Sequence, residues 1–146
     1  MSLPSLRLKA NAERRIRAGH LWVYSNEVDT RRSPLNDFEP GTQAELRAAN
    51  DKALGTVFVN PHALICGRLI SRDASRGMTP QRLTERMETA LALRERLFSK
   101  PFYRWVFGDS DGLSGLVIDT DLRWRIVTAL ARAGQIDADG AETPFI

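Results

Sequence analysis

The sequence predicts an α+β fold that is mostly β: a small barrel, then one helix and a small α/β hairpin domain. Three observations predict it. Short runs of alternating polar and apolar residues, separated by turn residues, fill residues 5–72. Residues 80–100 carry apolar side chains at helical spacing, and two strand-like runs after them flank a Gly-rich turn. We expect the polar stretch 71–77 to separate a domain of residues 1–75 from a second of residues 76–146.

The barrel is expected to begin with a strand, a short helix and a second strand. Residues 5–9 alternate polar and apolar side chains, which is the pattern of a half-buried strand. Asn11 is a suitable N-cap for a helix over residues 12–18, and Gly19 is a suitable residue to end it. Residues 21–24 then predict the second strand.

Three longer strands are expected to complete the barrel, after a loop of turn composition at residues 31–40. Short polar segments join the strand-like runs, so we expect them to pair as an antiparallel meander. Glycines within two runs predict bulges or sharp bends, which a small closed barrel of about five or six strands requires. The runs are residues 42–48, 53–60 and 63–72, and the glycines are Gly55 and Gly67.

The second half is expected to begin with a helix over residues 80–100. Thr79 can cap its start, Pro80 suits its first turn, and Pro101 ends it. One face is apolar, with Leu83, Met87, Ala90, Leu91, Leu97 and Phe98. The charged residues fall largely outside that face: Arg82, Arg86, Glu88, Arg94, Arg96 and Lys100.

A hairpin is expected to follow this helix. Its strands are the aromatic run 102–107 and residues 116–119, and its turn is the Gly- and Asp-rich segment 108–115. Residues 122–130 predict either a third strand or a short helix. Residues 131–146 show no closing element.

The composition indicates a soluble globular protein. Of the 146 residues, 42% are hydrophobic and 27% are charged, which is ordinary for that class. Cys66 is the only cysteine, which excludes an intramolecular disulfide and a cysteine zinc site and favours the cytoplasm. The N-terminus lacks the apolar run of a signal peptide, and no segment approaches the roughly 18 apolar residues of a membrane span. We therefore expect a cytoplasmic protein.

Residues 6–28 have the chemistry of a nucleic-acid surface. The net charge is +3, and residues 1–32 hold seven Lys or Arg against three Asp or Glu. The aromatic residues Trp22 and Tyr24 follow the cations directly. Cations can neutralise phosphate and flat rings can stack on unpaired bases. A solvated helix face followed by a core strand would show the same pattern, so both interpretations stay open.

No motif indicates a catalytic or metal site. The twelfth position of a calcium loop counted from Asp109 is Thr120 instead of Glu, so turn-capping aspartates are expected at Asp109, Asp111, Asp119 and Asp121. Residues 112–115 match the G-x-x-G loop of KH domains, but they lie between strand-like runs, which favours a turn.

The histidines and the cysteine do not suggest catalysis either. His20 and His62 have no second ligand at metal spacing, and Cys66 in the middle of a strand is expected to be a small buried side chain. No Gly-rich nucleotide-binding loop follows any strand-like run.

Five segments together resemble a known family. The first three are LRLKANAERRIRAGHLWVYSNEV, PGTQAEL and LGTVFVNPHALICGRLISRD, and the last two are ALALRERLF and PFYRWVFGDSDGLSGLVID. They resemble the N-terminal PUA domain, the linker helix and the hairpin of a class I methyltransferase family that makes 5-methylcytosine in large-subunit ribosomal RNA. The resemblance covers about residues 3–119. It implies a PUA-like pseudo-barrel that binds RNA, a role in rRNA methylation, and S-adenosylmethionine as the cofactor of the full-length family.

The chain departs from that family in two places. Ser114 stands where the family usually has Pro in D-G-L-P-G-L, and residues 120–125 replace the family's next turn. The family's cofactor-binding sheet and catalytic cysteine would follow, so Cys66 is not given that role and no cofactor is expected in this chain. We expect a truncated or frame-shifted product, or a stand-alone fragment, that is not catalytic alone.

The charge pattern and the resemblance together predict an RNA-binding surface, with ribosomal RNA as the partner and neither metal nor membrane. The candidate contacts are Lys9, Arg14, Arg15, Arg17, His20 and Trp22, with Arg68 and Arg72 in second place. Three alternatives stay open. The chain could be half of a split methyltransferase completed by another chain, a remnant that folds only in its barrel, or a protein-interaction module without RNA affinity.

Overall fold

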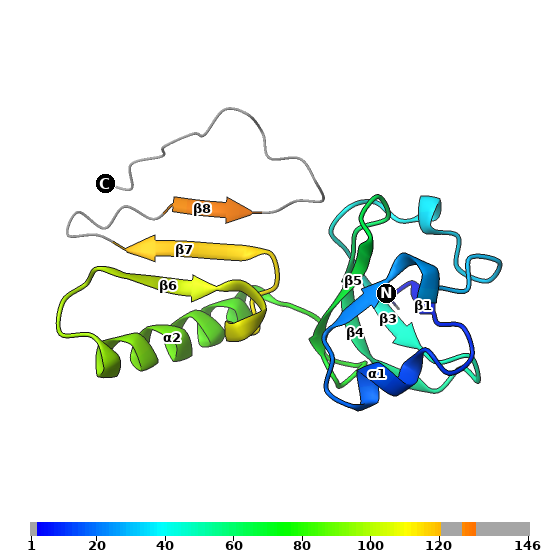
Figure 1. The fold of residues 1–146 in the computed structure, drawn as a ribbon, viewed down its shortest axis with the longest axis horizontal. Helices are drawn as coiled ribbons and strands as arrows, with labels where there is room; N and C mark the ends of the chain where they lie inside the picture. Colours follow the sequence, from blue (N-terminus) through cyan, green and yellow to red (C-terminus); the bar gives the residue numbers. More distant parts are fainter. Residues whose placement is uncertain (1–2, 121–126, 131–146) are drawn as a thin grey trace. The chain divides into compact units, whose positions relative to one another are not determined.

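The structure is a computed structural model that describes residues 3–120 and 127–130. The chain divides into two compact units, Met1–Met78 and Thr79–Ile146 (Figure 1). The first unit contains a five-stranded sheet in the order β1-β3-β4-β5-β2, and the second a three-stranded sheet in the order β6-β7-β8. The predicted mostly-β fold with a small pseudo-barrel is therefore confirmed. Within the described residues, no helix is both long and apolar enough to cross a membrane.

The first unit is a curled sheet closed by one short helix. Strands β3, β4 and β5 form the predicted antiparallel meander, while β1 pairs parallel with β3 and β2 pairs antiparallel with β5. The elements are β1 (Ser5–Arg7), α1 (Glu13–Arg17), β2 (Trp22–Tyr24), β3 (Thr42–Arg47), β4 (Ala53–Val59) and β5 (Ile65–Ser71). Side chains from every one of them enclose one core, which includes Leu6, Ile16, Val23, Leu46, Val57, Val59 and Leu69.

Gly55 allows β4 to bend closely against β5. Its φ is +146°, and a Cβ at this position would lie 2.1 Å from the carbonyl oxygen of Ser71. The strand register shifts on both sides of β4 near this residue, between Leu46 and Arg47 and between Thr56 and Val57. The bulge predicted at Gly55 is confirmed. Gly67 lies beside a further register shift in the pairing of β2 with β5.

The second unit consists of a helix and a three-stranded sheet. Its elements are α2 (Pro80–Leu97), β6 (Tyr103–Phe107), β7 (Leu116–Thr120) and β8 (Val127–Leu130). Thr79 caps α2 as predicted, because its Oγ1 accepts a hydrogen bond of 3.3 Å from the Arg82 amide. The helix ends at Leu97, before the predicted Lys100. Residues 127–130 form a strand, and residues 122–126 and 131–146 of the prediction lie outside the described residues.

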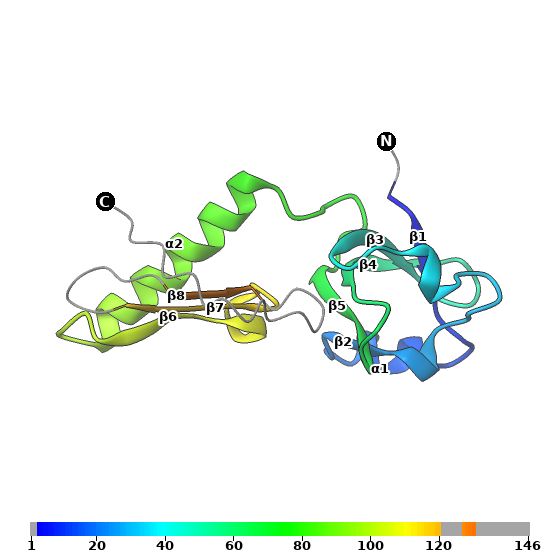
Figure 2. The same cartoon turned by 90° about the horizontal axis from the view of Figure 1, so that it is seen from above.

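Helix α2 packs against β6, the edge strand of the second sheet, which Figure 2 shows nearly edge-on. Ala90 of the helix and Val106 and Ile118 of the sheet are buried. The predicted apolar face was wrong at both ends, since Leu83, Leu97 and Phe98 are exposed. Two arginines predicted to lie outside that face instead reach the hairpin turn: Arg86 donates to the Gly112 carbonyl, and Arg94 pairs with Asp111. The hairpin turn provides a carbonyl and a carboxylate that accept hydrogen bonds from these two guanidinium groups. These charge-assisted bonds hold both side chains against the hairpin, although their positions lie outside the apolar face of the helix.

Candidate nucleic-acid interface

Helix α1 is short but firmly anchored. Its central residue Ile16 is buried in the core. At its C-terminal end, the Gly19 amide donates to the Ile16 carbonyl and the His20 amide to the Arg15 carbonyl, each at 3.1 Å. This double closure around a glycine with φ of +112° is a Schellman motif, and it confirms Gly19 as the end of the helix.

The predicted N-cap of this helix was wrong. Asn11 has a φ of +68° and belongs to the turn before the helix, while Ala12 occupies the N-cap position without a side-chain hydrogen bond. Asn is one of the few residues that tolerate the left-handed region, which suits it to this tight connection from β1.

Arg14 and Arg17 lie on the exposed side of α1. Within the described part of the chain, neither guanidinium has a hydrogen-bond or ion-pair partner. His20 is also exposed, directly after the helix. An arginine in solvent keeps all five donors available, so these side chains can bind a phosphate without breaking an existing contact.

Arg15 and Arg72 instead have partners within the first unit and hold helix α1 in place. Arg15 pairs with Glu27 at 2.8 Å and its guanidinium lies 4.8 Å from the centre of the Tyr24 ring. The hydrogen bond that Arg15 donates to the Glu27 carboxylate raises the pKa of Arg15. Arg72, directly after β5, donates to the Ile16 carbonyl at 2.7 Å and so ties the end of α1 to the sheet.

Lys9 is exposed on the connection from β1 to α1, where its Nζ donates to the Asn26 carbonyl at 2.8 Å. An ammonium group has three donors, so this single bond leaves the charge able to attract an anion.

Trp22 and Arg68 form part of a row across the outer surface of the first sheet. Trp22 lies opposite Arg68, whose guanidinium is 5.8 Å from the centre of the indole ring, and Arg68 lies opposite Phe58 on β4. Their neighbours Val23, Val57, Val59 and Leu69 are buried, so these three side chains point away from the core. We call Trp22, Arg68 and Phe58 the outer row.

Sequence reasoning missed Phe58. The residue alternates with the buried Val57 and Val59, so its outward direction was readable from the sequence. Its position opposite Arg68 depends on the register of β4 against β5, which contains a bulge that the sequence does not locate.

Sequence reasoning also missed a cluster of three arginines around the β3–β4 turn. Asp51 accepts hydrogen bonds from Arg7 at 2.8 Å and Arg32 at 2.6 Å, and its carbonyl accepts one from Arg47 at 2.9 Å. The bonds from Arg7 and Arg32 lower the pKa of Asp51. The partners are far apart in sequence, so no local pattern indicates the cluster. Asp51 already occupies donors of Arg7 and Arg32, so fewer donors are available to a phosphate here than on Arg14 and Arg17 of α1.

The remaining candidate groups are structural. Cys66 is buried as predicted, and burial raises the pKa of its thiol to about 11, so it is a weak nucleophile at neutral pH. Asp111 caps a turn as predicted, since its Oδ2 accepts a bond of 2.6 Å from the Phe107 amide. Among the residues that the structure describes, no three His, Cys, Asp or Glu side chains gather as a metal site would require.

The family of the first unit follows from a comparison with known domains. Residues 6–72 match the family model of the PUA-like domain. The first unit contains a PUA-like domain. The match begins in β1 and ends directly after β5, so it includes residues of all five strands and helix α1. The PUA-like pseudo-barrel implied by the sequence resemblance is confirmed.

The relatives of the chain are named as ribosomal RNA methyltransferases. A ribosomal RNA large subunit methyltransferase of Deinococcus radiodurans is 32% identical over 127 residues, which are 81% of this chain and 30% of the relative. A ribosomal RNA large subunit methyltransferase I of Alteromonas mediterranea is 27% identical over 135 residues, 90% of this chain and 33% of the relative. The chain therefore spans about a third of the length of these curated relatives.

Solved structures show the same fold. A Streptococcus mutans protein assigned to the SAM-dependent methyltransferases matches with a TM-score of 0.63 and 22% identity, over 80% of this chain and 30% of that one. A second structure, of a protein assigned as a methyltransferase and complexed with SAH, matches with the same score and coverage. At this identity the likeness concerns the fold.

Proposed function

We propose that the PUA-like domain binds RNA, and that its target is large-subunit ribosomal RNA. The observation that carries the proposal is the pair Arg14 and Arg17, exposed and without side-chain partners in the described structure, on a helix anchored to the core. The names of the relatives support ribosomal RNA as the target. RNA of this kind is found in the cytoplasm, where we expect the protein to act.

The candidate residues fall into three roles in this proposal. Arg14, Arg17 and Lys9 neutralise phosphates, because their charges face solvent. His20 and the outer row contact unstacked bases, and Trp22, which is 39% exposed, provides a large ring for stacking. Arg15 and Arg72 position the helix through Glu27 and the Ile16 carbonyl.

We further propose that RNA binding by this chain serves a methyl-transfer reaction like the one in the relatives' names. S-adenosylmethionine carries a carboxylate but is cationic overall, so the two available guanidinium groups on α1 favour the phosphates of RNA over this cofactor. No methyl-transfer step is assigned to them.

A salt titration with paired variants tests RNA binding. Affinity for a fragment of large-subunit ribosomal RNA is measured at several salt concentrations for the wild type and for Arg14→Gln/Arg17→Gln. We expect affinity to fall roughly ten-fold or more and the slope of log K against log salt to decrease by about 1.5, since each lost phosphate contact removes roughly 0.7–0.9. The matched control is Arg31→Gln/Lys52→Gln, which removes two exposed charges from other loops of the same unit.

The control variant should retain most of the wild-type slope. If both variants lost RNA affinity and salt slope equally, the effect would be one of net charge alone. This result would contradict the assignment of phosphate binding to α1. Unchanged binding in Arg14→Gln/Arg17→Gln would remove this helix from the proposed function and favour a protein-interaction role.

A further inference from the structure

We propose that the end of α2 and the outer edge of β6 form a second RNA contact, which takes unstacked bases of a single strand. The proposal rests on the proposed function, because it adds a contact of a different kind to the same ligand. It concerns the second unit, in which the sequence analysis placed no candidate binding residue.

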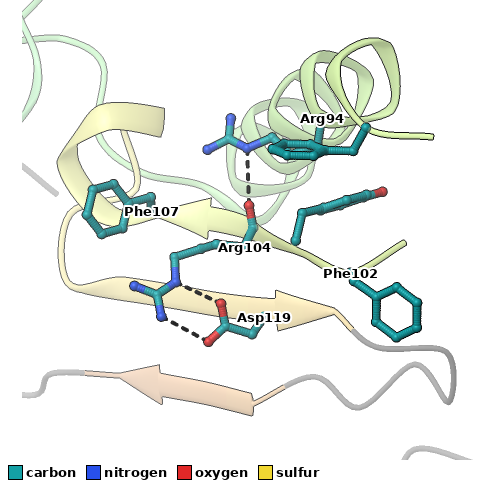
Figure 3. Close-up of a pocket in the computed structure, with 7 residues that line it drawn as sticks. Arg94, Phe102, Arg104, Phe107 and Asp119 are labelled. Carbon is teal, nitrogen blue, oxygen red and sulfur yellow. Dashed lines mark hydrogen bonds and ion pairs between the residues drawn. The ribbon is translucent and has the colours of Figure 1, made fainter. Parts of the chain in front are cut away.

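The site is a groove of about 540 Å³ lined by four aromatic rings and two arginines (Figure 3). Phe98 and Phe102 follow α2, while Tyr103 and Phe107 stand at the two ends of β6. The lining is completed by Arg94, Arg104 and Asp119. We call this site the β6 groove.

Its aromatic rings are unusually accessible. Phe98, Phe102 and Phe107 are exposed by 49%, 56% and 53%. Phe98 stacks on Tyr103 with 5.5 Å between ring centres, so the two rings already form a stack that a base can extend. Exposed phenylalanines gathered at one place mark an interaction site, and flat rings accept bases of any sequence by stacking.

The charge around the β6 groove complements phosphate. Residues 93–107 contain Arg94, Arg96, Lys100 and Arg104 against Glu95. Arg94 and Arg104 are paired with Asp111 and Asp119, so the charge available to phosphate comes mainly from Arg96 and Lys100. Arg96 and Lys100 are exposed and have no ion-pair partner in the described residues. Arg104 lies 5.4 Å from the centre of the Phe107 ring and binds Asp119 through Nε and Nη2. Its Nη1 has no partner among the described residues and is available to a phosphate oxygen.

A protein partner fits the groove less well. An added strand would need the free edge of β6, but Arg94 already donates to the Arg104 carbonyl at 3.2 Å and Asp111 accepts from the Phe107 amide. Protein interfaces are also depleted of Lys and other charges at their centres, whereas cations here alternate with the rings. Bases in a duplex cannot stack on side chains, so the geometry points to a single strand.

The test uses the full chain and a fluorescent oligouridylate of about ten nucleotides, a length near that bound by one single-strand site. The variant is Phe102→Ala/Phe107→Ala, whose rings are more than half exposed, so the core is unchanged. The matched control is Leu97→Ala, an apolar side chain that is 67% exposed and does not line the groove. NMR signals of the phenylalanine rings are followed in the same titrations.

We expect Phe102→Ala/Phe107→Ala to bind the oligouridylate roughly ten-fold more weakly at every salt concentration, because stacking is lost while the cations remain. The salt slope should stay unchanged, Leu97→Ala should bind as the wild type, and Phe102→Trp should retain binding. The ring signals of Phe102 and Phe107 should shift upon binding.

The possible failures are distinguishable. Wild-type affinity in Phe102→Ala/Phe107→Ala overturns this inference and leaves the role of α1 standing. Binding that depends on Phe102 and Phe107 but not on Arg14 and Arg17 overturns the role of α1 alone. A wild-type chain that binds no RNA at low salt overturns both. If the wild-type chain self-associates and Phe102→Ala/Phe107→Ala does not, while RNA affinity is unchanged, the groove is a protein surface and the inference is overturned.

Discussion

Helices α1 and α2 both carry arginines, but their guanidinium groups have different partners. Arg14 and Arg17 on α1 have none within the described structure, whereas Arg86 and Arg94 on α2 are bonded to the hairpin turn of their own unit. The charge balance differs too: residues 1–78 hold twelve Lys or Arg against eight Asp or Glu, and residues 79–146 hold nine against ten. Under the proposed function, the availability of their donors therefore distinguishes the candidate RNA surface better than the number of arginines does.

The Arg94–Asp111 pair shows the structural use of arginine. Its two parallel bonds measure 2.7 and 2.8 Å, and the two side chains are only 13% and 7% exposed. Arg86 is half-buried, and this burial together with the nearby Arg82 lowers its pKa. Such groups fix α2 to the hairpin and close the edge of β6. A phosphate group could bind Arg86 or Arg94 only after their bonds to the hairpin turn were broken.

Removing this pair is expected to give the largest effect. Arg94→Ala leaves the carboxylate of Asp111 buried and unpaired, which should lower the free energy of unfolding of the second unit by about 3 kcal/mol. Hydrogen exchange under increasing urea, read by mass spectrometry, can follow each unit separately. The first unit should keep its protection.

The control is Arg96→Ala on the same helix, an exposed arginine whose loss should cost less than about 0.5 kcal/mol. If both variants destabilised the second unit equally, the contrast between paired and unpaired arginines would fail.

Arg72 gives an intermediate effect within the first unit. Arg72→Ala removes the bond to the Ile16 carbonyl, so the free energy of unfolding should fall by about 1.5 kcal/mol, as for a hydrogen bond to a charged group. RNA affinity should also fall, because α1 is held less well. The salt slope should not change, since Arg72 positions the helix and leaves the phosphates to Arg14 and Arg17.

Thermal unfolding and the same salt titration measure both effects. The comparison variant is Arg31→Ala, which removes an exposed arginine without a side-chain partner in the described structure. If the salt slope of Arg72→Ala were as low as that of Arg17→Gln, Arg72 would be a phosphate contact. This result would contradict its role as a residue that only positions the helix.

Local patterns in the sequence predicted most elements of the fold. Alternation predicted the β3-β4-β5 meander, Thr79 and Pro80 predicted the start of α2, and Gly19 predicted the end of α1. In each case the cause lies within a few residues of chain, through side-chain direction, capping or a positive φ.

The sequence could not predict features that depend on distant partners. The apolar pattern of α2 did not reveal that Arg94 would turn toward Asp111, and the basic run did not separate Arg14 from Arg15, which Glu27 holds. Both outcomes depend on carboxylates that only folding brings near. The candidate list therefore named the basic stretch as a whole, but could not assign a separate role to each arginine in it.

The central claim is that unpaired arginines of the PUA-like domain bind RNA while paired arginines build the fold. Arginine-selective modification with phenylglyoxal, read by mass spectrometry with and without bound large-subunit ribosomal RNA, tests it most directly. Without RNA, Arg14 and Arg17 should react fast and Arg94 slowly; with RNA, Arg14 and Arg17 should be protected while Arg94 is unchanged. Equal reactivity of Arg14 and Arg17 in free and bound protein would contradict the claim.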